Sequence, residues 1–284
     1  MQVFPNAKIN FGLKVLRRRT DGYHDLETVF LPVKGLHDTL DINIAPAGRE
    51  TSFLQTGIQV DCPPEQNLII RTLRLMQERF AKVGEVDIRF EKNIPFGAGL
   101  GGGSADAAFT AKALNGLFGL HLTDEELEEI VSPLGADCPF FIQNRPRCAT
   151  GTGNVFTEVP EAFLKQLQDK WLLLVKPDAA VSTAAAYRGI TPRESRFDWN
   201  DIGSFTNDFE QSVFPLFPEI ADVKRRLLQA GALHAAMSGS GATVFGLFDQ
   251  PVTDAGRLFP ACFCHQEQMT FNFCTPYGDF STSL

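Results

Sequence analysis

Five of the seven residues from position 97 to position 103 are glycine. Because glycine has no Cβ, the backbone N–H groups of such a segment can point at a ligand without obstruction. The alanine-rich stretch that follows predicts a helix to about Phe118, with Ser104 as its N-cap. The positive end of that helix would lie beside the glycines. The segment therefore predicts a site that binds a polyphosphate.

Two other interpretations of this segment stay open from its residues alone. Gly97, Gly99 and Gly102 satisfy the pattern G-x-G-x-x-G of nicotinamide-dependent oxidoreductases, which follows a strand directly and precedes an acidic residue about twenty positions later. Here Pro95 separates the glycines from the strand expected at 86–90, and the acids at that spacing begin a helix. A flexible turn is the second interpretation. The Walker A and protein-kinase motifs are missing from the sequence.

Four polar residues outside the glycine segment each have a structural interpretation from the residues alone, and a functional one that only the family resemblance given below implies. Asp137 precedes Cys138 and Pro139, so it is either the N-cap of a helix or a catalytic carboxylate. Lys8 is either a solvated lysine on a strand or a companion of such a carboxylate. His24 is either a structural histidine or a ligand contact. Asn67 is either the N-cap of the helix expected at 67–80 or part of a nucleotide pocket.

The elements that must position these residues follow from hydrophobic periodicity. In the first half we expect strands at 8–16, 25–33, 39–44 and 86–90, and helices at 67–80, 104–118 and from a capping box at Thr123 to Pro133. In the second half we expect a strand at 171–176, a helix at 220–231, two short strands within 235–248, a helix after Pro251 and a last strand at 269–274. A change of pattern near 155–160 predicts two lobes, residues 1–155 and 156–284.

Composition limits the function further. The chain has 284 residues and a net charge of −8, which argues against a surface for nucleic acid or for an anionic membrane. It contains no run of about 18 apolar residues, and its first residues lack the apolar core of a signal peptide, so we expect a cytoplasmic protein. The six cysteines are therefore expected to be reduced thiols, and the spacing of Cys262, Cys264, His265 and Cys274 does not match the usual zinc sites.

Several segments together resemble one known family. Pro95-x-Gly97-x-Gly99-Leu100-Gly101-Gly102-Gly103-Ser104 is similar to the phosphate-binding motif of the GHMP kinases. The resemblance extends, in the family's order, to residues 7–13, residues 21–30 (with Asp21-Gly22-Tyr23-His24, Thr28 and Phe30), residues 134–141 and residues 238–245. Segment 21–30 is the specific part, since it resembles the members that phosphorylate 4-diphosphocytidyl-2-C-methyl-D-erythritol.

This resemblance implies an α/β (α+β) fold with two lobes, the first like ribosomal protein S5 domain 2 and the second ferredoxin-like, with the site in the cleft. The implied reaction transfers the γ-phosphoryl group of ATP to the 2-hydroxyl of that cytidine-diphosphate-linked substrate, in isoprenoid precursor biosynthesis. The implied cofactors are ATP and Mg²⁺, and the chain would be a monomer or a homodimer. Another GHMP-type kinase is the first alternative, a nicotinamide-dependent oxidoreductase the second, and a non-catalytic nucleotide-binding module the third.

The resemblance also implies a role for each matching residue. Asp137 would be the catalytic base and Lys8 its companion. The ATP site would comprise Pro95, Gly97, Gly99, Leu100, Gly101, Gly102, Gly103, Ser104 and Asn67. The substrate site would comprise Asn10, Tyr23, His24, Thr183, Tyr187, Asn207, Gly239, Ser240 and Gly241. No dedicated protein ligand for a metal is implied, although the Ser104 hydroxyl would lie near a phosphate or Mg²⁺. Asp106 stands where the family usually has asparagine, and so close to phosphates its carboxylate would repel them unless it points away or meets Mg²⁺ or a base.

Overall fold

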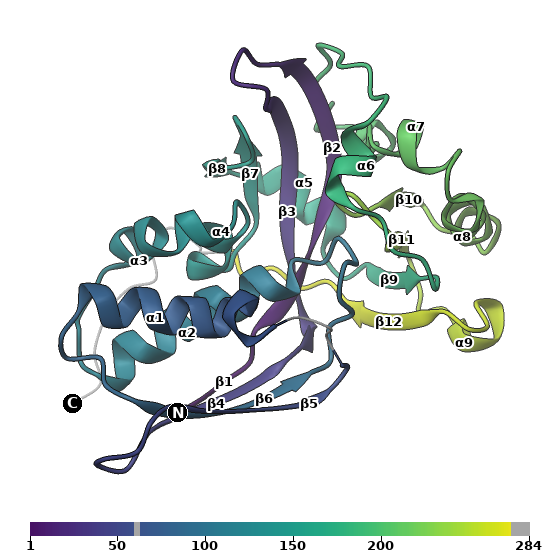
Figure 1. Cartoon of the computed structure of the whole chain (residues 1–284). Coiled ribbons are helices and arrows are strands. Elements are labelled where there is room, and N and C mark those ends of the chain that lie inside the picture. The colour runs from purple at the N-terminus through teal and green to yellow at the C-terminus, as the bar shows by residue number, and fades with distance from the viewer. Residues whose placement is uncertain (60–62, 274–284) are drawn as a thin grey trace, which may run out of the picture.

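The computed structural model describes residues 1–59 and 63–273 of the chain. The long strands β2 (Asn6–Arg18) and β3 (His24–His37) run through the middle of the molecule, with the first four helices on one side and a separate sheet on the other (Figure 1). They form an antiparallel sheet of order β2-β3-β7-β8 with β7 (Arg147–Thr150) and β8 (Val155–Glu158). None of its helices is long and apolar enough to cross a membrane, within the residues described.

A second sheet has the order β1-β4-β6-β5, from β1 (Gln2–Val3), β4 (Thr39–Ile44), β6 (Val86–Lys92) and β5 (Ser52–Gly57). Its pairs are antiparallel except β5 with β6. The strands predicted at 8–16, 25–33, 39–44 and 86–90 are confirmed, and all but the third lie within longer strands. β1, β5, β7 and β8 were not predicted, because these short segments do not alternate clearly between apolar and polar residues.

The helices of the first half are α1 (Leu68–Arg79), α2 (Gly102–Leu117), α3 (Asp124–Val131) and α4 (Cys138–Gln143). The capping box is present at the start of α3, since Thr123 and Glu126 exchange side-chain and backbone hydrogen bonds. Ser104 was predicted to be the N-cap of α2, and this prediction is wrong. The N-cap is Gly101, three residues earlier, which adopts the left-handed conformation that turns the chain into the helix (φ 71°).

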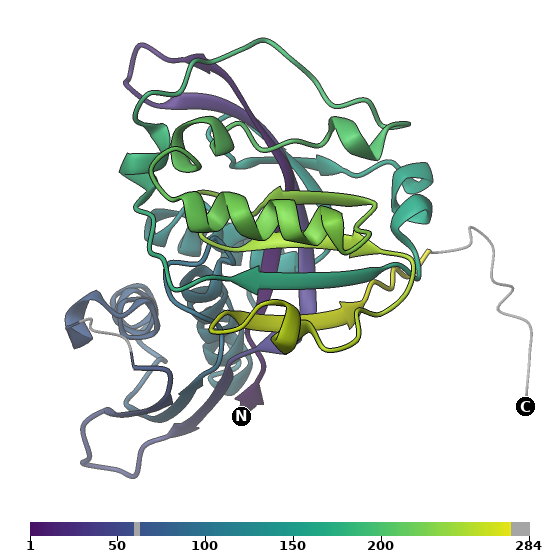
Figure 2. The same cartoon turned by 90° about the vertical axis from the view of Figure 1, so that its right-hand side faces the viewer.

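The third sheet consists of β9 (Trp171–Lys176), β10 (His234–Met237), β11 (Val244–Phe248) and β12 (Phe263–Gln268). Its order is β10-β11-β9-β12, with every neighbouring pair antiparallel. The connections through α8 (Pro218–Gln229) and α9 (Ala255–Leu258) complete a βαββαβ arrangement, and α8 lies across the sheet (Figure 2). This is the ferredoxin-like topology that the resemblance implied.

The last strand lies at a different place from the predicted 269–274. β12 is an edge strand of mainly polar residues that pairs with β9. The apolar Met269 comes after it and is buried without continuing the strand. The predicted strand was wrong because apolar residues here mark core contacts rather than backbone pairing. Its final residue, Cys274, lies outside the described residues, as does Cys62.

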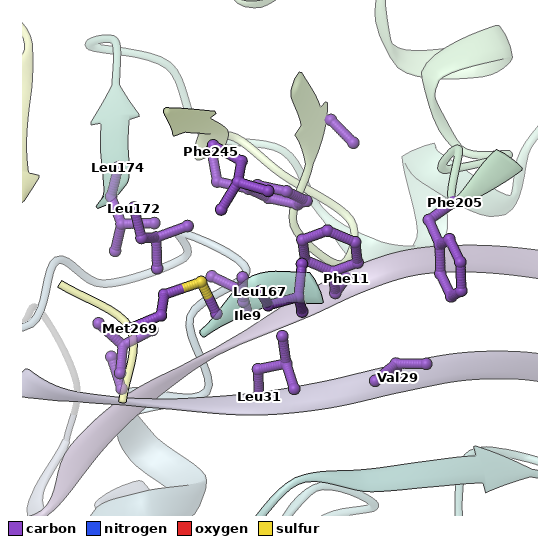
Figure 3. Packing of buried hydrophobic residues seen from close by; sticks show 14 of the residues in the cluster. Ile9, Phe11, Val29, Leu31, Leu167, Leu172, Leu174, Phe205, Phe245 and Met269 are labelled. Carbon is purple, nitrogen blue, oxygen red and sulfur yellow. The ribbon is translucent and has the colours of Figure 1, made fainter. Parts of the chain in front are cut away.

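Shorter elements complete the connections: η1 (Pro64–Gln66), η2 (Ser132–Leu134), α5 (Glu161–Leu167), α6 (Thr183–Tyr187), η3 (Ile202–Ser204) and α7 (Glu210–Val213). One hydrophobic core joins the first half of the chain to the second. Ile9, Phe11 and Leu31 pack with Leu174 and Phe245 of the third sheet (Figure 3). The division into lobes at residue 155 stays a prediction.

Candidate active site

A cavity of about 470 Å³ lies where the glycine-rich loop, β2, β3 and the start of α4 meet the turn after β10. Segments far apart in sequence line it: residues 95–104, residues 239–241, and single side chains of both halves of the chain. Asp137, Lys8, Asn10, Thr183 and Tyr187 are among them. The fold therefore brings most of the predicted site residues to one place.

The glycine-rich loop is fixed by packing and hydrogen bonds rather than being a flexible turn. Gly99 has φ of +73°, and a Cβ there would lie 2.1 Å from the carbonyl oxygen of Ser238. The Ser238 hydroxyl donates to the Gly99 carbonyl oxygen at 2.9 Å. The backbone N–H of Lys8 donates to the Leu100 carbonyl oxygen at 2.9 Å. Glycine is thus required at position 99, and the flexible-turn interpretation is wrong.

The amino end of α2 has features that favour an anion. Gly102, Gly103 and Ser104 occupy its first turn and line the cavity. The first N–H groups of a helix have no partner within the helix, and the helix dipole is positive at this end. A phosphate group fits this environment without requiring a cationic side chain.

Asp137 and Lys8 form an ion pair in the lining of the cavity. Lys8 Nζ lies 3.2 Å from Asp137 Oδ2, and the side chains are 3% and 32% exposed, respectively. Asp137 precedes α4 at the N-cap position, but its side chain makes no capping bond there. Lys8 is buried on β2 rather than solvated, and it also donates to Asn10 Oδ1 at 2.5 Å. The pair thus combines a partly accessible carboxylate with a fixed cation.

Two aromatic rings are associated with the cavity, although His24 itself is not among its lining residues. Tyr187 lines it, and the His24 ring stacks on Tyr187 with centroids 4.8 Å apart and planes at 23°. Burial lowers the pKa of His24, and nearby Arg18 adds to this. Burial also raises the pKa of the Tyr187 hydroxyl. Tyr23 is 67% exposed and is not among the lining residues.

Two predicted residues are engaged elsewhere. Asn67 Oδ1 accepts from the N–H of Ile69 at 2.9 Å, so this side chain caps α1. Asn207 is buried and donates to the carbonyl oxygens of Met237 and Gly239. Neither residue lines the cavity, and their ligand roles stay predictions. Asn207 instead holds the turn that contains Gly239, Ser240 and Gly241.

Asp106 is not among the lining residues of the cavity and pairs with a base, Lys92. It is buried, and its carboxylate lies 2.8 Å from Lys92 Nζ, which also binds Asp38 at 2.5 Å. Asp38 in turn accepts hydrogen bonds from the backbone N–H groups of Asn93 and Ile94, which lead into the glycine-rich loop. Burial raises the pKa of Asp106 well above its ordinary value, although Lys92 lowers it. This cluster therefore fixes the backbone that leads into the glycine-rich loop.

Sequence reasoning missed several lining residues. Phe96 projects from the loop and is 68% exposed, while Lys92 lines the cavity from β6. Thr28 and Phe30 lie on β3, and the Lys8 ammonium lies 5.0 Å from the centroid of the Phe30 ring. Both β3 residues belong to segment 21–30, which was the available signal. Within residues 1–59 and 63–273, no group of three or more His, Cys, Asp or Glu side chains could hold a metal ion.

Comparisons with known proteins agree with this geometry. The family model "GHMP kinases N terminal domain" matches residues 67–145, and "GHMP kinases C terminal" matches residues 193–257. A protein of Parabacteroides distasonis named 4-diphosphocytidyl-2-C-methyl-D-erythritol kinase is 48% identical over 280 residues, covering 95% of this chain and 100% of that protein. One of Bacteroides fragilis with the same name is 46% identical over 281 residues, covering 95% and 100%.

Solved structures give the same result. A crystal structure of 4-(cytidine 5'-diphospho)-2C-methyl-D-erythritol kinase superposes with a TM-score of 0.78 at 31% identity, covering 94% of this chain and 98% of that one. Homoserine kinase from Cytophaga hutchinsonii superposes with a TM-score of 0.63 at 17% identity, covering 95% and 94%. The second likeness concerns the fold alone.

Proposed function

Because the chain belongs to the GHMP kinase family, among the 4-diphosphocytidyl-2-C-methyl-D-erythritol kinases, we propose that it transfers the γ-phosphoryl group of ATP to the 2-hydroxyl of 4-diphosphocytidyl-2-C-methyl-D-erythritol. One observation carries the proposal. The Lys8–Asp137 pair and the amino end of α2 line the same cavity. Asp137 can therefore receive a hydroxyl proton while the amino end of α2 holds phosphates.

The ATP phosphates would bind the first turn of α2 and the glycine-rich loop. The close approach of Gly99 to Ser238 leaves no room for a side chain, which suits backbone recognition of phosphate. Mg²⁺ commonly binds through substrate phosphates and few protein groups, so the cavity's Ser104 hydroxyl and Asp137 carboxylate are a fitting donor set. When bound, the ion would neutralise charge on the transferred group.

Asp137 would orient the substrate hydroxyl and accept its proton as the oxygen bonds to the γ-phosphorus and ADP leaves. Lys8 would keep the carboxylate in place, since its ammonium is buried and has fixed partners. Phosphoryl transfer depends mainly on positioning and on stabilising charge, which is what a rigid pair supplies. Both roles rest on the geometry of the cavity.

The cytosine base would bind against the aromatic side chains at the cavity. Tyr187 offers a ring face there, and His24, now stacked on it, offers polar edge atoms. Stacking on an aromatic side chain contributes about 1–3 kcal/mol per base in nucleic-acid complexes. Tyr23, Thr183, Ser240 and the adjoining glycines complete the proposed substrate site. A cytoplasmic monomer or homodimer is also part of the proposal.

The test is release of ADP from ATP and the cytidylated substrate, with wild type and Asp137→Asn. The amide has the same shape as the carboxylate but cannot accept the proton, so we expect kcat to fall at least about hundredfold. Asp124→Asn, at an exposed position in the first turn of α3, is the matched control and should behave as wild type.

Other outcomes would support the alternatives. No ADP release from wild type would refute the proposal. Phosphorylation of an alcohol that lacks the cytidine part, at the same kcat/KM, would indicate another GHMP-type kinase. Binding of NADH without binding of ATP would favour an oxidoreductase.

A further inference from the structure

Thr28 has no part in the reaction proposed above, although it lies in segment 21–30 and lines the cavity. It is on β3 and is 1% exposed. Its hydroxyl donates to the Gly12 carbonyl oxygen at 2.6 Å and accepts from Asn10 Nδ2 at 3.0 Å. A bulge in the pairing of β2 with β3, between Asn10 and Leu13, accompanies this arrangement.

The single proton of this hydroxyl determines how Asn10 is oriented. A threonine hydroxyl has one proton to donate, and here that proton is directed at Gly12. Towards Asn10 the oxygen can then only accept, so the NH₂ group of the amide must face Thr28. The opposite end of the amide, Asn10 Oδ1, consequently faces Lys8 Nζ at 2.5 Å.

The orientation of Asn10 in turn fixes the ammonium of Lys8. The three protons of an ammonium need three acceptors. Lys8 Nζ donates to Asn10 Oδ1 and to the Gly99 carbonyl oxygen at 3.4 Å, and it forms an ion pair with Asp137 Oδ2 at 3.2 Å. If the amide turned over, its NH₂ group would face the ammonium, and the two donors would repel each other.

We propose that Thr28 is a positioning residue, whose hydroxyl sets the orientation of the Asn10 amide and thereby holds Lys8 against Asp137. This inference rests on the proposed function, because it takes Lys8 and Asp137 as the catalytic pair. Thr28 itself has no free proton for a substrate in this arrangement. It therefore affects the rate of the chemical step rather than the binding of either substrate.

The experiment compares Thr28→Val, which keeps the shape and removes the hydroxyl, with Thr28→Ser, which keeps the hydroxyl. For Thr28→Val we expect kcat to fall about tenfold to a hundredfold, because a hydrogen bond to a charged group loses its support. Both KM values should stay within about twofold of wild type. Thr28→Ser should recover most of kcat.

Thr110→Val is the matched control. Thr110 is also fully buried, but its hydroxyl donates only to the Asp106 carbonyl oxygen within α2. Thermal unfolding of Thr110→Val measures how the loss of a buried threonine hydroxyl changes stability. The variant should leave kcat unchanged. If Thr28→Val does not fold, Thr28→Cys replaces it, with a thiol that is a weaker partner and the same expected direction.

Three results would overturn the inference. A raised KM with unchanged kcat would make Thr28 a substrate contact. A serine variant as impaired as the valine variant would indicate a packing role. Equal Lys8–Asp137 distances in crystal structures of wild type and Thr28→Val would remove the proposed link. That last comparison decides the inference even if wild type releases no ADP, an outcome that would refute only the proposed function.

Discussion

His234 is a buried base that the proposed reaction does not use. It lies on β10 with its ring centroid 5.4 Å from that of Phe11 and 5.8 Å from that of Phe245. Burial, and to a lesser extent the charge of Lys224, lower its pKa to about 4. In the unfolded chain its pKa is about 6.5. Between these two values the unfolded chain binds more protons, so stability falls as the pH falls through this window.

This predicts a pH dependence that a variant can isolate. Wild type should lose about 2 kcal/mol of unfolding free energy between pH 7 and pH 5 relative to His234→Gln, which cannot be protonated. Urea unfolding of both proteins across that range measures the difference. All other titrating groups are common to the two proteins and cancel. Parallel pH profiles would show that His234 is not kept neutral by the fold.

At the scale of elements, the glycine-rich loop and the turn after β10 act as one unit. Gly99 packs directly against the backbone of Ser238, and the Ser238 hydroxyl binds the loop. The loop comes from the first half of the chain and the turn from the second. A change that separates them should therefore disturb phosphate binding at the amino end of α2.

Gly99→Ala tests this coupling. Its Cβ would clash with a backbone oxygen 2.1 Å away, so we expect ATP affinity to fall at least about tenfold, equivalent to 1.4 kcal/mol. Gly97→Ala is the control, since position 97 is also left-handed but has no atom within 4 Å of such a Cβ. It should show only the conformational penalty, of about 1–3 kcal/mol in stability. Equal ATP affinities for the two variants would contradict the coupling.

At the scale of the whole molecule, the shared core decides whether the two proposed lobes unfold separately. Ile9, Phe11 and Leu31 of the first half pack with Leu174 and Phe245 of the second (Figure 3). β2 also contributes Leu13 to a further cluster built mainly from the second half. We therefore expect one cooperative unfolding transition for the whole chain.

Leu174→Ala should lower the unfolding free energy by about 2–5 kcal/mol, because a fully buried leucine leaves a cavity. It should do so without splitting the transition. Unfolding followed by tryptophan fluorescence, which reports Trp171 and Trp199, is compared with unfolding followed by circular dichroism. Leu54→Ala, at a position 59% exposed, should change stability by less than about 0.5 kcal/mol. Two separate transitions, only one of them shifted, would show independent lobes.

Local features were predictable wherever one short segment settles its own conformation. The capping box at Thr123 and the Asn67 cap need only residues two or three positions away. The glycine-rich loop needs backbone angles that glycine alone adopts readily. Strands with alternating or strongly apolar residues were found for the same reason. The edge strand β12 was misplaced because backbone pairing with β9, and not its own polar residues, makes it a strand.

The sequence by itself therefore determined the elements with strong local signals, the phosphate-binding character of the glycine-rich segment and, through its motifs, the family. Only the tertiary structure decided which polar residues meet. Lys8 and Asp137 are far apart in the chain, and their contact, like that of Asp106 with Lys92, depends on how β2, β6, α2 and α4 pack. Whether an asparagine caps a helix, holds a turn or faces the cavity depends on the same packing. Such contacts between distant residues have no local signature, since they exist only once the shared core has formed.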